Sequence, residues 1–294
     1  MRMICFMKKP ILLFFTCLIL AGVVLGSEAG CAAKTPARVE VPILMYHNLC
    51  EDSESSQVST NTITRGQFEA ELALLDKLGK NTVTFDELIA YVEEGTPLPK
   101  NPVCLTFDDG YLSNYEIAFP ILQERGMKAT IFVIGATVGN KEHYKETDFP
   151  ITPHFDYTEA KEMVDSGLIS IQSHTYDMHQ WAKYETGNEI RTNILKLPNE
   201  TEEEYTLAVT KDLTRSRTEI EEKAGNPVNV LAYPGGSFDD LSQKLVKELG
   251  IKATLAITPG KAELIYGKQE SLFAMNRFYV TDNTTEEIFR EWLK

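Results

Sequence analysis

Two short stretches of the sequence combine side chains that bind metals and transfer protons. Residues 105–111 place Asp108 and Asp109 after an apolar stretch and before a glycine, and residues 173–179 place His174 and His179 after another apolar stretch. Side chains alternate between the two faces of an extended chain, so the aspartates can have different roles, one binding a metal and one moving protons. One carboxylate with two imidazoles is a common ligand set for a divalent metal with open coordination positions.

The spacing of the two histidines restricts how they can share an ion. His174 and His179 are five positions apart, so they would diverge by about 140° on a helix and face opposite sides of a strand. They can meet only if the chain turns between them, and Thr175 and Asp177 are suited to stabilise such a turn. The alternatives stay open: Asp-Asp-Gly is also ordinary turn chemistry, and each histidine alone can be a simple polar residue.

Composition sets the class of protein. The chain has 294 residues and a formal net charge of −14, which allows one large domain or two small ones and argues against nucleic acid as a partner. Five cysteines occur, two of them near the N-terminus. The three that remain form no disulfide framework, and Cys104 fits a small core residue.

The N-terminus has the order of an export signal. Lys8 and Lys9 precede an apolar run over residues 11–25, and small residues follow up to Ala29. Residues 1–29 are therefore a signal peptide or membrane anchor, residues 30–40 a linker and residues 41–294 the folded domain. Lipoprotein processing at Cys31 and an uncleaved anchor are the alternatives. All of these readings place the domain outside the cell, secreted or tethered to the outer face of the membrane.

The rest of the chain alternates between strand and helix patterns. Strands are predicted at residues 41–47, 82–85, 103–107, 129–134, 168–171, 228–232, 253–257 and 278–280, and helices at 64–78, 84–95, 115–125, 158–165, 203–224, 241–249 and 284–293. This alternation predicts an α/β fold with parallel strands, and favours a (β/α) barrel over an open sheet. Active sites of such barrels lie at the carboxyl ends of the strands, where both motifs fall. The polar loops at 139–156 and 182–202 can line a substrate groove.

Residues 106–111 together with 173–179 resemble the polysaccharide deacetylase family, the NodB-homology domains of carbohydrate esterase family 4. The resemblance covers roughly residues 41–294. It implies a distorted (β/α)7 barrel and a metal-dependent hydrolase, acting as a monomer, that removes acetyl groups from N-acetylglucosamine polymers of an extracellular or cell-wall glycan. The implied cofactor is a divalent metal, with Zn²⁺ as the first choice.

The resemblance also assigns roles to individual residues. It implies that Asp108 is the general base and that Asp109, His174 and His179 are the metal ligands. The backbone N–H of Tyr111 is implied to stabilise the oxyanion. These roles agree with metal-assisted hydrolysis, in which one carboxylate takes a proton from the attacking water.

The sequence departs from the common family pattern in three places. The motif histidines are five rather than four apart, Ala232 stands where an arginine is usual, and no histidine follows His179. Residues 45–47, Met-Tyr-His, instead resemble the branch of poly-β-1,6-N-acetylglucosamine deacetylases, whose acid histidine comes from the N-terminal strand. The resemblance thus implies His47 as general acid, with a structural hydrogen bond as the alternative.

Four further residues have a functional and a structural interpretation. Arg277 can replace the missing arginine and orient Asp108, or it can be a surface charge. Tyr233 and Pro234 can shape the substrate groove beside the metal, or pack in the core. Trp181 can stack on a sugar, because aromatic rings offer flat apolar faces, or it can be a packing residue.

Three other functions compete with the hydrolase. A catalytically inactive glycan-binding module on the same fold would keep the barrel but release no acetate. A metal phosphoesterase often uses two metals bridged by additional carboxylates, whereas the motifs supply ligands for one. A dinucleotide-binding fold requires Gly-x-Gly-x-x-Gly after the first strand, and this chain has none there.

Overall fold

The computed structural model describes residues 38–185 and 189–294. The chain divides into two units, Met1–Thr35 and Pro36–Lys294, and the described residues all belong to the second. The predicted signal or anchor and most of the predicted linker lie outside the described residues. Strand β1 (Val39–Val41) begins two residues before the predicted start of the domain.

Seven parallel strands form the central sheet, in the order β10 (Ala253–Leu255), β9 (Val230–Ala232), β8 (Ile169–Ser173), β7 (Ala129–Val133), β6 (Pro102–Asp109), β2 (Ile43–Tyr46) and β12 (Phe278–Tyr279). A parallel bridge between Leu255 and Met275, just before β12, joins the two edges of the sheet. A short strand, β5 (Asn81–Thr82), pairs with the start of β6. The expected α/β class and distorted seven-stranded barrel are confirmed.

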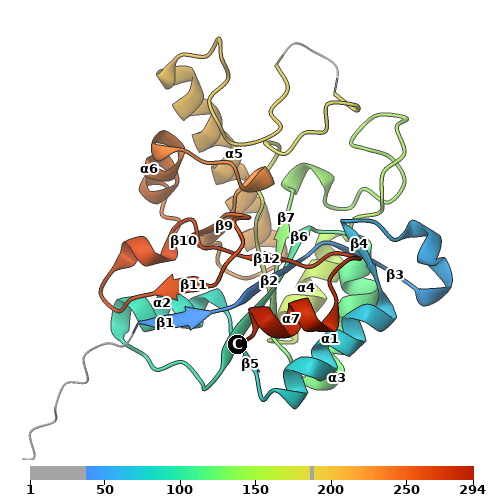
Figure 1. Cartoon of the computed structure of the whole chain (residues 1–294). Helices are drawn as coiled ribbons and strands as arrows, with labels where there is room; N and C mark the ends of the chain where they lie inside the picture. Colours follow the sequence, from blue (N-terminus) through green and yellow to red (C-terminus); the bar gives the residue numbers. More distant parts are fainter. Residues whose placement is uncertain (1–37, 186–188) are drawn as a thin grey trace, which may run out of the picture. The chain divides into compact units, whose positions relative to one another are not determined.

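Helices connect the strands, as the alternation predicts (Figure 1). They are α1 (Arg65–Lys77), α2 (Phe85–Glu94), α3 (Phe119–Arg125), α4 (Tyr157–Asp165), α5 (Glu202–Lys223), α6 (Asp240–Glu248) and α7 (Glu286–Trp292). Thr84 and Glu87 form the predicted reciprocal cap of α2. At α1, Thr64 accepts from the Gln67 backbone, but the Gln67 side chain bonds to Glu71 and to the Thr281 carbonyl instead.

Some short elements were not predicted from the sequence. β1 pairs with β11 (Ala262–Leu264) in an antiparallel ladder, and β3 (Asn48–Cys50) pairs with β4 (Thr62–Thr64). Between β3 and β4, a 3-10 helix (Asp52–Gln57) occupies part of a predicted loop, and a π-helical turn (Asn114–Ala118) precedes α3. Three-residue strands show too little alternation to stand out in a sequence.

The side chains of strand β6 alternate between the core packed under the helices and the interior of the barrel. Val103, Leu105 and Phe107 belong to the cluster that packs against α1, α3 and α4. Cys104 belongs to a second cluster, with residues of β2, β7 and β10. Because side chains alternate along a strand, Asp108 lies on the same face as Cys104 and enters the barrel interior with its side chain almost fully buried.

Two further features concern membrane-spanning helices and free cysteines. Across residues 38–185 and 189–294, no helix combines the length and apolar character needed to span a membrane. Cys50 and Cys104 are buried free thiols. Cys104 is a core residue, as predicted from the sequence.

Candidate functional site

Asp109, His174 and His179 come together at the carboxyl ends of β6 and β8. One ligand atom from each lies within 4.8 Å of the others. The Nε2 atoms of His174 and His179 lie 3.6 and 3.7 Å from Asp109 Oδ1. The two motifs that the sequence separates by more than sixty residues therefore converge on one point, and this group could hold a metal ion.

The donor set fits a tetrahedral divalent ion. Ligand atoms about 2.0–2.1 Å from zinc at a tetrahedral angle lie about 3.4 Å apart, close to the two distances found here. Asp109 Oδ1 is buried and has no hydrogen-bond donor among the described residues. A buried carboxylate oxygen without a partner is costly, and a cation at this point would remove that cost.

The His174 ring is prepared to act as a ligand through Nε2. Its Nδ1 lies 2.8 Å from the Ala232 carbonyl oxygen, so Nδ1–H donates there and Nε2 keeps its lone pair. Burial lowers the pKa of His174 to about 4, although the charges of Asp108 and Asp109 oppose the shift. The imidazole is therefore neutral near pH 7, the form that binds metals.

Two residues at the candidate site, one of them a candidate ligand, have left-handed backbone. Asp109 has φ 73° and Thr175, directly after His174, has φ 70°. Such backbone is rare for residues other than glycine, above all for β-branched ones, and costs on the order of 1–3 kcal/mol. Here it turns the chain at the end of each strand. Thr175 Oγ1 also accepts from the Met178 backbone N–H at 3.1 Å, so Thr175 stabilises the turn as expected.

Asp212 of α5 fastens the turn between the two histidines. Its carboxylate accepts the backbone N–H groups of Tyr176 and Asp177, each at 2.7 Å. The Asp177 side chain, expected to stabilise the turn, instead pairs with Lys145 and accepts from Gln180. Sequence reasoning missed Asp212, because a single aspartate inside a long amphipathic helix carries no local signal.

Asp108 is held by a buried arginine. Both terminal nitrogens of Arg277 lie 2.8 Å from the Asp108 oxygens, and Arg277 Nε donates to the Ala256 carbonyl. Arg277 is completely buried, which excludes the surface-charge reading. Burial alone would raise the pKa of Asp108, but the Arg277 guanidinium outweighs it and holds that pKa well below its usual range. Asp108 is thus a fixed, ionised carboxylate next to the candidate metal ligands.

His47 approaches the same site from the end of β2. Its ring lies 4.9 Å from the ring of Tyr279, and its carbonyl accepts from Asn114 Nδ2 at 2.7 Å. His47 Nδ1 is buried without a hydrogen-bond partner. The imidazole is close enough for its charge to lower the pKa of Asp109 and of Asp108, in both cases against the opposite effect of burial.

Tyr111 contacts one of the candidate metal ligands, Asp109, through its side chain. Its hydroxyl donates to Asp109 Oδ2 at 3.0 Å. Because Asp109 Oδ2 accepts this hydrogen bond, the other oxygen, Oδ1, is the one that lies near His174 and His179. This side-chain contact is additional to the oxyanion role that the resemblance implies for the backbone N–H of Tyr111.

Tyr233 and Pro234 are both buried where the chain leaves β9. The Tyr233 side chain is fully buried, stacks on Phe238 at 5.1 Å and packs against α5 and α6. Pro234 is buried as well. This burial favours the core-packing interpretation, and the groove-shaping role of the two residues stays a prediction. The Ala232 carbonyl, one residue earlier, is the group that contacts His174.

Comparisons with known proteins show which family and fold this chain resembles. A family model described as polysaccharide deacetylase matches residues 95–254. The chain is similar to a poly-beta-1,6-N-acetyl-D-glucosamine N-deacetylase of Staphylococcus aureus (strain MRSA252), with 26% identity over 245 residues covering 82% of this chain and 75% of that protein. It is also similar in structure to IcaB from Ammonifex degensii (25% identity, TM-score 0.66, 86% of this chain and 97% of that one). A de-N-acetylase from Aggregatibacter actinomycetemcomitans shares the fold (TM-score 0.71, 23% identity, 86% of this chain and 100% of that one).

Proposed function

The chain belongs to the polysaccharide deacetylase family, and from this premise we propose that it is a metal-dependent hydrolase that removes N-acetyl groups from an N-acetylglucosamine polymer. The observation that carries the proposal is the group of Asp109, His174 and His179 within 4.8 Å of one another, with Asp108 ionised beside it. A binding module without catalysis has no need of a buried carboxylate fixed by a buried arginine next to a ligand set.

The proposed metal ligands are Asp109, His174 and His179, and a divalent ion there, Zn²⁺ by preference, would acidify water and polarise the acetyl carbonyl. Asp108 takes the proton from water as it attacks the carbonyl carbon. Arg277 holds Asp108 with both oxygens engaged, which fixes the direction of the free lone pairs. The backbone N–H of Tyr111 is the proposed donor to the developing oxyanion.

The leaving amine needs a proton, and His47 is the proposed donor. It reaches the site from the end of β2, across the barrel from β8, the strand that precedes His174 and His179. Its Nδ1 has no hydrogen-bond partner among the described residues. We expect His47→Ala to lower kcat for acetyl release by about 100-fold, the usual range for loss of a general acid. The check is the steady-state rate with and without added imidazole; an unchanged rate would remove His47 from the mechanism.

The surroundings of the domain complete the proposal. The Staphylococcus aureus relative is named as a poly-beta-1,6-N-acetyl-D-glucosamine N-deacetylase. That polymer is therefore the first substrate to test. Residues 1–29 are the proposed export signal or anchor and residues 30–40 the proposed linker, so that the domain works as a monomer outside the cell, released or tethered.

The deciding experiment is acetate release from a panel of acetylated glycans. Poly-β-1,6-N-acetylglucosamine, peptidoglycan and chitin oligomers are each incubated with the protein, with chelator, and with chelator followed by zinc. We expect release from at least one glycan, loss with chelator and recovery with zinc. Full activity after metal removal contradicts the metal role, and no release from any glycan leaves the inactive binding module.

A further inference from the structure

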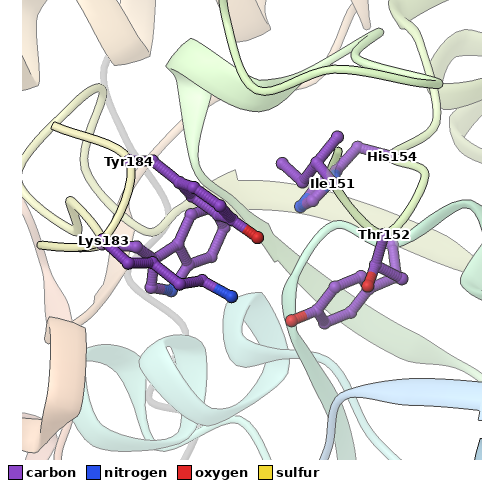
Figure 2. A pocket seen from close by; sticks show the side chains of 7 residues that line it. Ile151, Thr152, His154, Lys183 and Tyr184 are labelled. Carbon is purple, nitrogen blue, oxygen red and sulfur yellow. The ribbon is translucent and has the colours of Figure 1, made fainter. Parts of the chain in front are cut away.

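A small cavity of about 160 Å³ lies between two loops beside the proposed active site. Figure 2 shows Lys183 and Tyr184 on one side of it, facing Ile151, Thr152 and His154 on the other. The loops at 139–156 and after His179 supply these residues. Pockets for drug-sized ligands measure about 300–1,000 Å³, so this one is suited to a single sugar ring or its acetamido group.

The cavity adjoins the metal ligands without containing them. Tyr111, in its lining, donates to Asp109. The ring of Trp181, also in the lining, lies 6.1 Å from the ring of His179. Neither Asp108 nor any of the three proposed ligands lines the cavity. A group bound here would therefore lie next to the reacting acetyl group rather than in its place.

His154 is the feature that points to a ligand. Its side chain is 1% exposed, and neither ring nitrogen makes a hydrogen bond of normal geometry with the protein, although the Thr152 backbone lies near. Buried polar atoms are nearly always satisfied. Figure 2 shows a ring nitrogen of His154 directed into the cavity, where a hydroxyl or an amide of a ligand would supply the missing partner.

The opposite wall offers rigid aromatic faces. Trp181 and Tyr184 are half-buried and both pack on Tyr144, at ring distances of 5.5 and 5.0 Å, and Tyr144 is itself buried. Lys183 Nζ lies 4.4 Å from the centre of the Tyr184 ring and is the one charged side chain among the described residues of the lining. Aromatic faces suit sugar rings and methyl groups, whereas the ammonium disfavours a cationic ligand.

We propose that this cavity is a subsite for the sugar next to the one being deacetylated, and that it accepts this neighbour in its N-acetylated form. The inference rests on the proposed function and adds a rule to it. An acetamido neighbour is neutral, places its methyl against the aromatic wall and presents amide and hydroxyl groups to His154. A deacetylated neighbour carries an ammonium beside Lys183. The enzyme would then avoid sites next to units it has already processed.

The test uses trisaccharides of the linkage that the acetate-release panel identifies. One is fully acetylated, and two carry a free amine on one or the other neighbour of the central sugar. We expect wild-type kcat/KM at the central sugar to favour the fully acetylated form over at least one amine form by about two- to fivefold, the range of an accessible charge pair. Lys183→Gln removes that preference, whereas Lys244→Gln, an exposed lysine on α6, retains it.

A second pair of variants tests the aromatic wall. Tyr184→Ala should reduce the gain in kcat/KM from N-acetylglucosamine to the trisaccharide by about tenfold, mainly through KM, as expected for the loss of an aromatic contact. Tyr266→Ala, an exposed tyrosine outside the cavity, keeps the gain. If Tyr184→Ala and Lys183→Gln both behave as wild type, the subsite is refuted.

Direct binding separates this inference from the proposed function. The chain has two tryptophans, so Trp292→Phe leaves Trp181 as the single reporter. In an Asp108→Asn, Trp292→Phe protein we expect saturable change of Trp181 emission with β-1,6-linked or β-1,4-linked tri-N-acetylglucosamine, weakened by Tyr184→Ala. Absence of acetate release from every glycan overturns the function, while absence of this emission change overturns the subsite.

Discussion

The two neighbouring aspartates have different partners, although they differ by one position in the chain. Asp108 is bound by Arg277, whereas Asp109 meets the two motif histidines and Tyr111. Strand alternation separates their side chains, and the left-handed backbone of Asp109 turns the second one toward β8. One carboxylate is thus available for a metal and the other for a proton.

At this scale, Asp109→Ala or His174→Ala should abolish stoichiometric metal binding. Each substitution removes one of three protein ligands and with it most of the affinity. Metal content after dialysis measures the effect, and circular dichroism checks the fold. Retention of one metal per chain in either variant would falsify the ligand assignment.

Asp108→Asn should keep the metal and stop turnover. The amide retains a hydrogen bond to Arg277 but cannot take a proton, so we expect kcat to fall by about 10²–10⁴, the range for a general base. Metal content and acetate release are measured on the same sample. Near wild-type turnover would assign the base elsewhere.

At the scale of elements, the site depends on a helix that supplies no ligand. Asp212 of α5 binds two backbone N–H groups of the turn between His174 and His179. Burial raises the pKa of Asp212 to about 6, against the lowering effect of these two hydrogen bonds. The two backbone N–H groups of the turn thus have their acceptor in this buried carboxylate.

We therefore expect Asp212→Ala to weaken metal binding by about 10- to 100-fold, as loss of an outer-shell partner does, while the barrel still folds. Calorimetric titration with zinc measures the affinity. Asp165→Ala on α4, whose carboxylate makes an exposed ion pair with Lys161, is the matched control. Equal affinities in the two variants would show that the turn holds its shape without Asp212.

At the scale of the whole molecule, the barrel buries charged groups that couple its stability to pH. Glu71 of α1 is 7% exposed and accepts from Tyr46 and Gln67, each at 2.9 Å. Burial raises the pKa of Glu71 to about 7, and the two hydrogen bonds only partly oppose it. Between about pH 4.5 and 7 the folded state thus binds more protons at this site than the unfolded state.

It follows that the free energy of unfolding falls as pH rises through this window. A shift from 4.5 to about 7, at about 1.4 kcal/mol per unit, corresponds to a Glu71 contribution of about 3 kcal/mol that is present below pH 4.5 and lost above 7. Urea unfolding from pH 5 to 8 should show a smaller decline in Glu71→Gln than in wild type. Glu69→Gln, which changes an accessible carboxylate on the same helix, should show the same decline as wild type. If Glu71→Gln also declined like wild type, the assignment to Glu71 would be wrong.

The sequence by itself predicted the major elements and the candidate metal ligands. Periodicity, caps and glycine stops predicted the seven major helices and the barrel strands within a few residues, because these signals are local. Two motifs after apolar strands predicted a shared site, because the carboxyl ends of parallel strands meet at one end of a barrel.

Only the tertiary structure decided which distant side chains serve that site. Arg277 and Asp108 are 169 positions apart, and Asp212 lies more than thirty positions after the turn it holds. Tyr233 lies in the core, and His154, to which the sequence assigned no role of its own, lines a cavity. Such partners depend on how the barrel closes and where its loops cross, and no local pattern in a single chain encodes those distances.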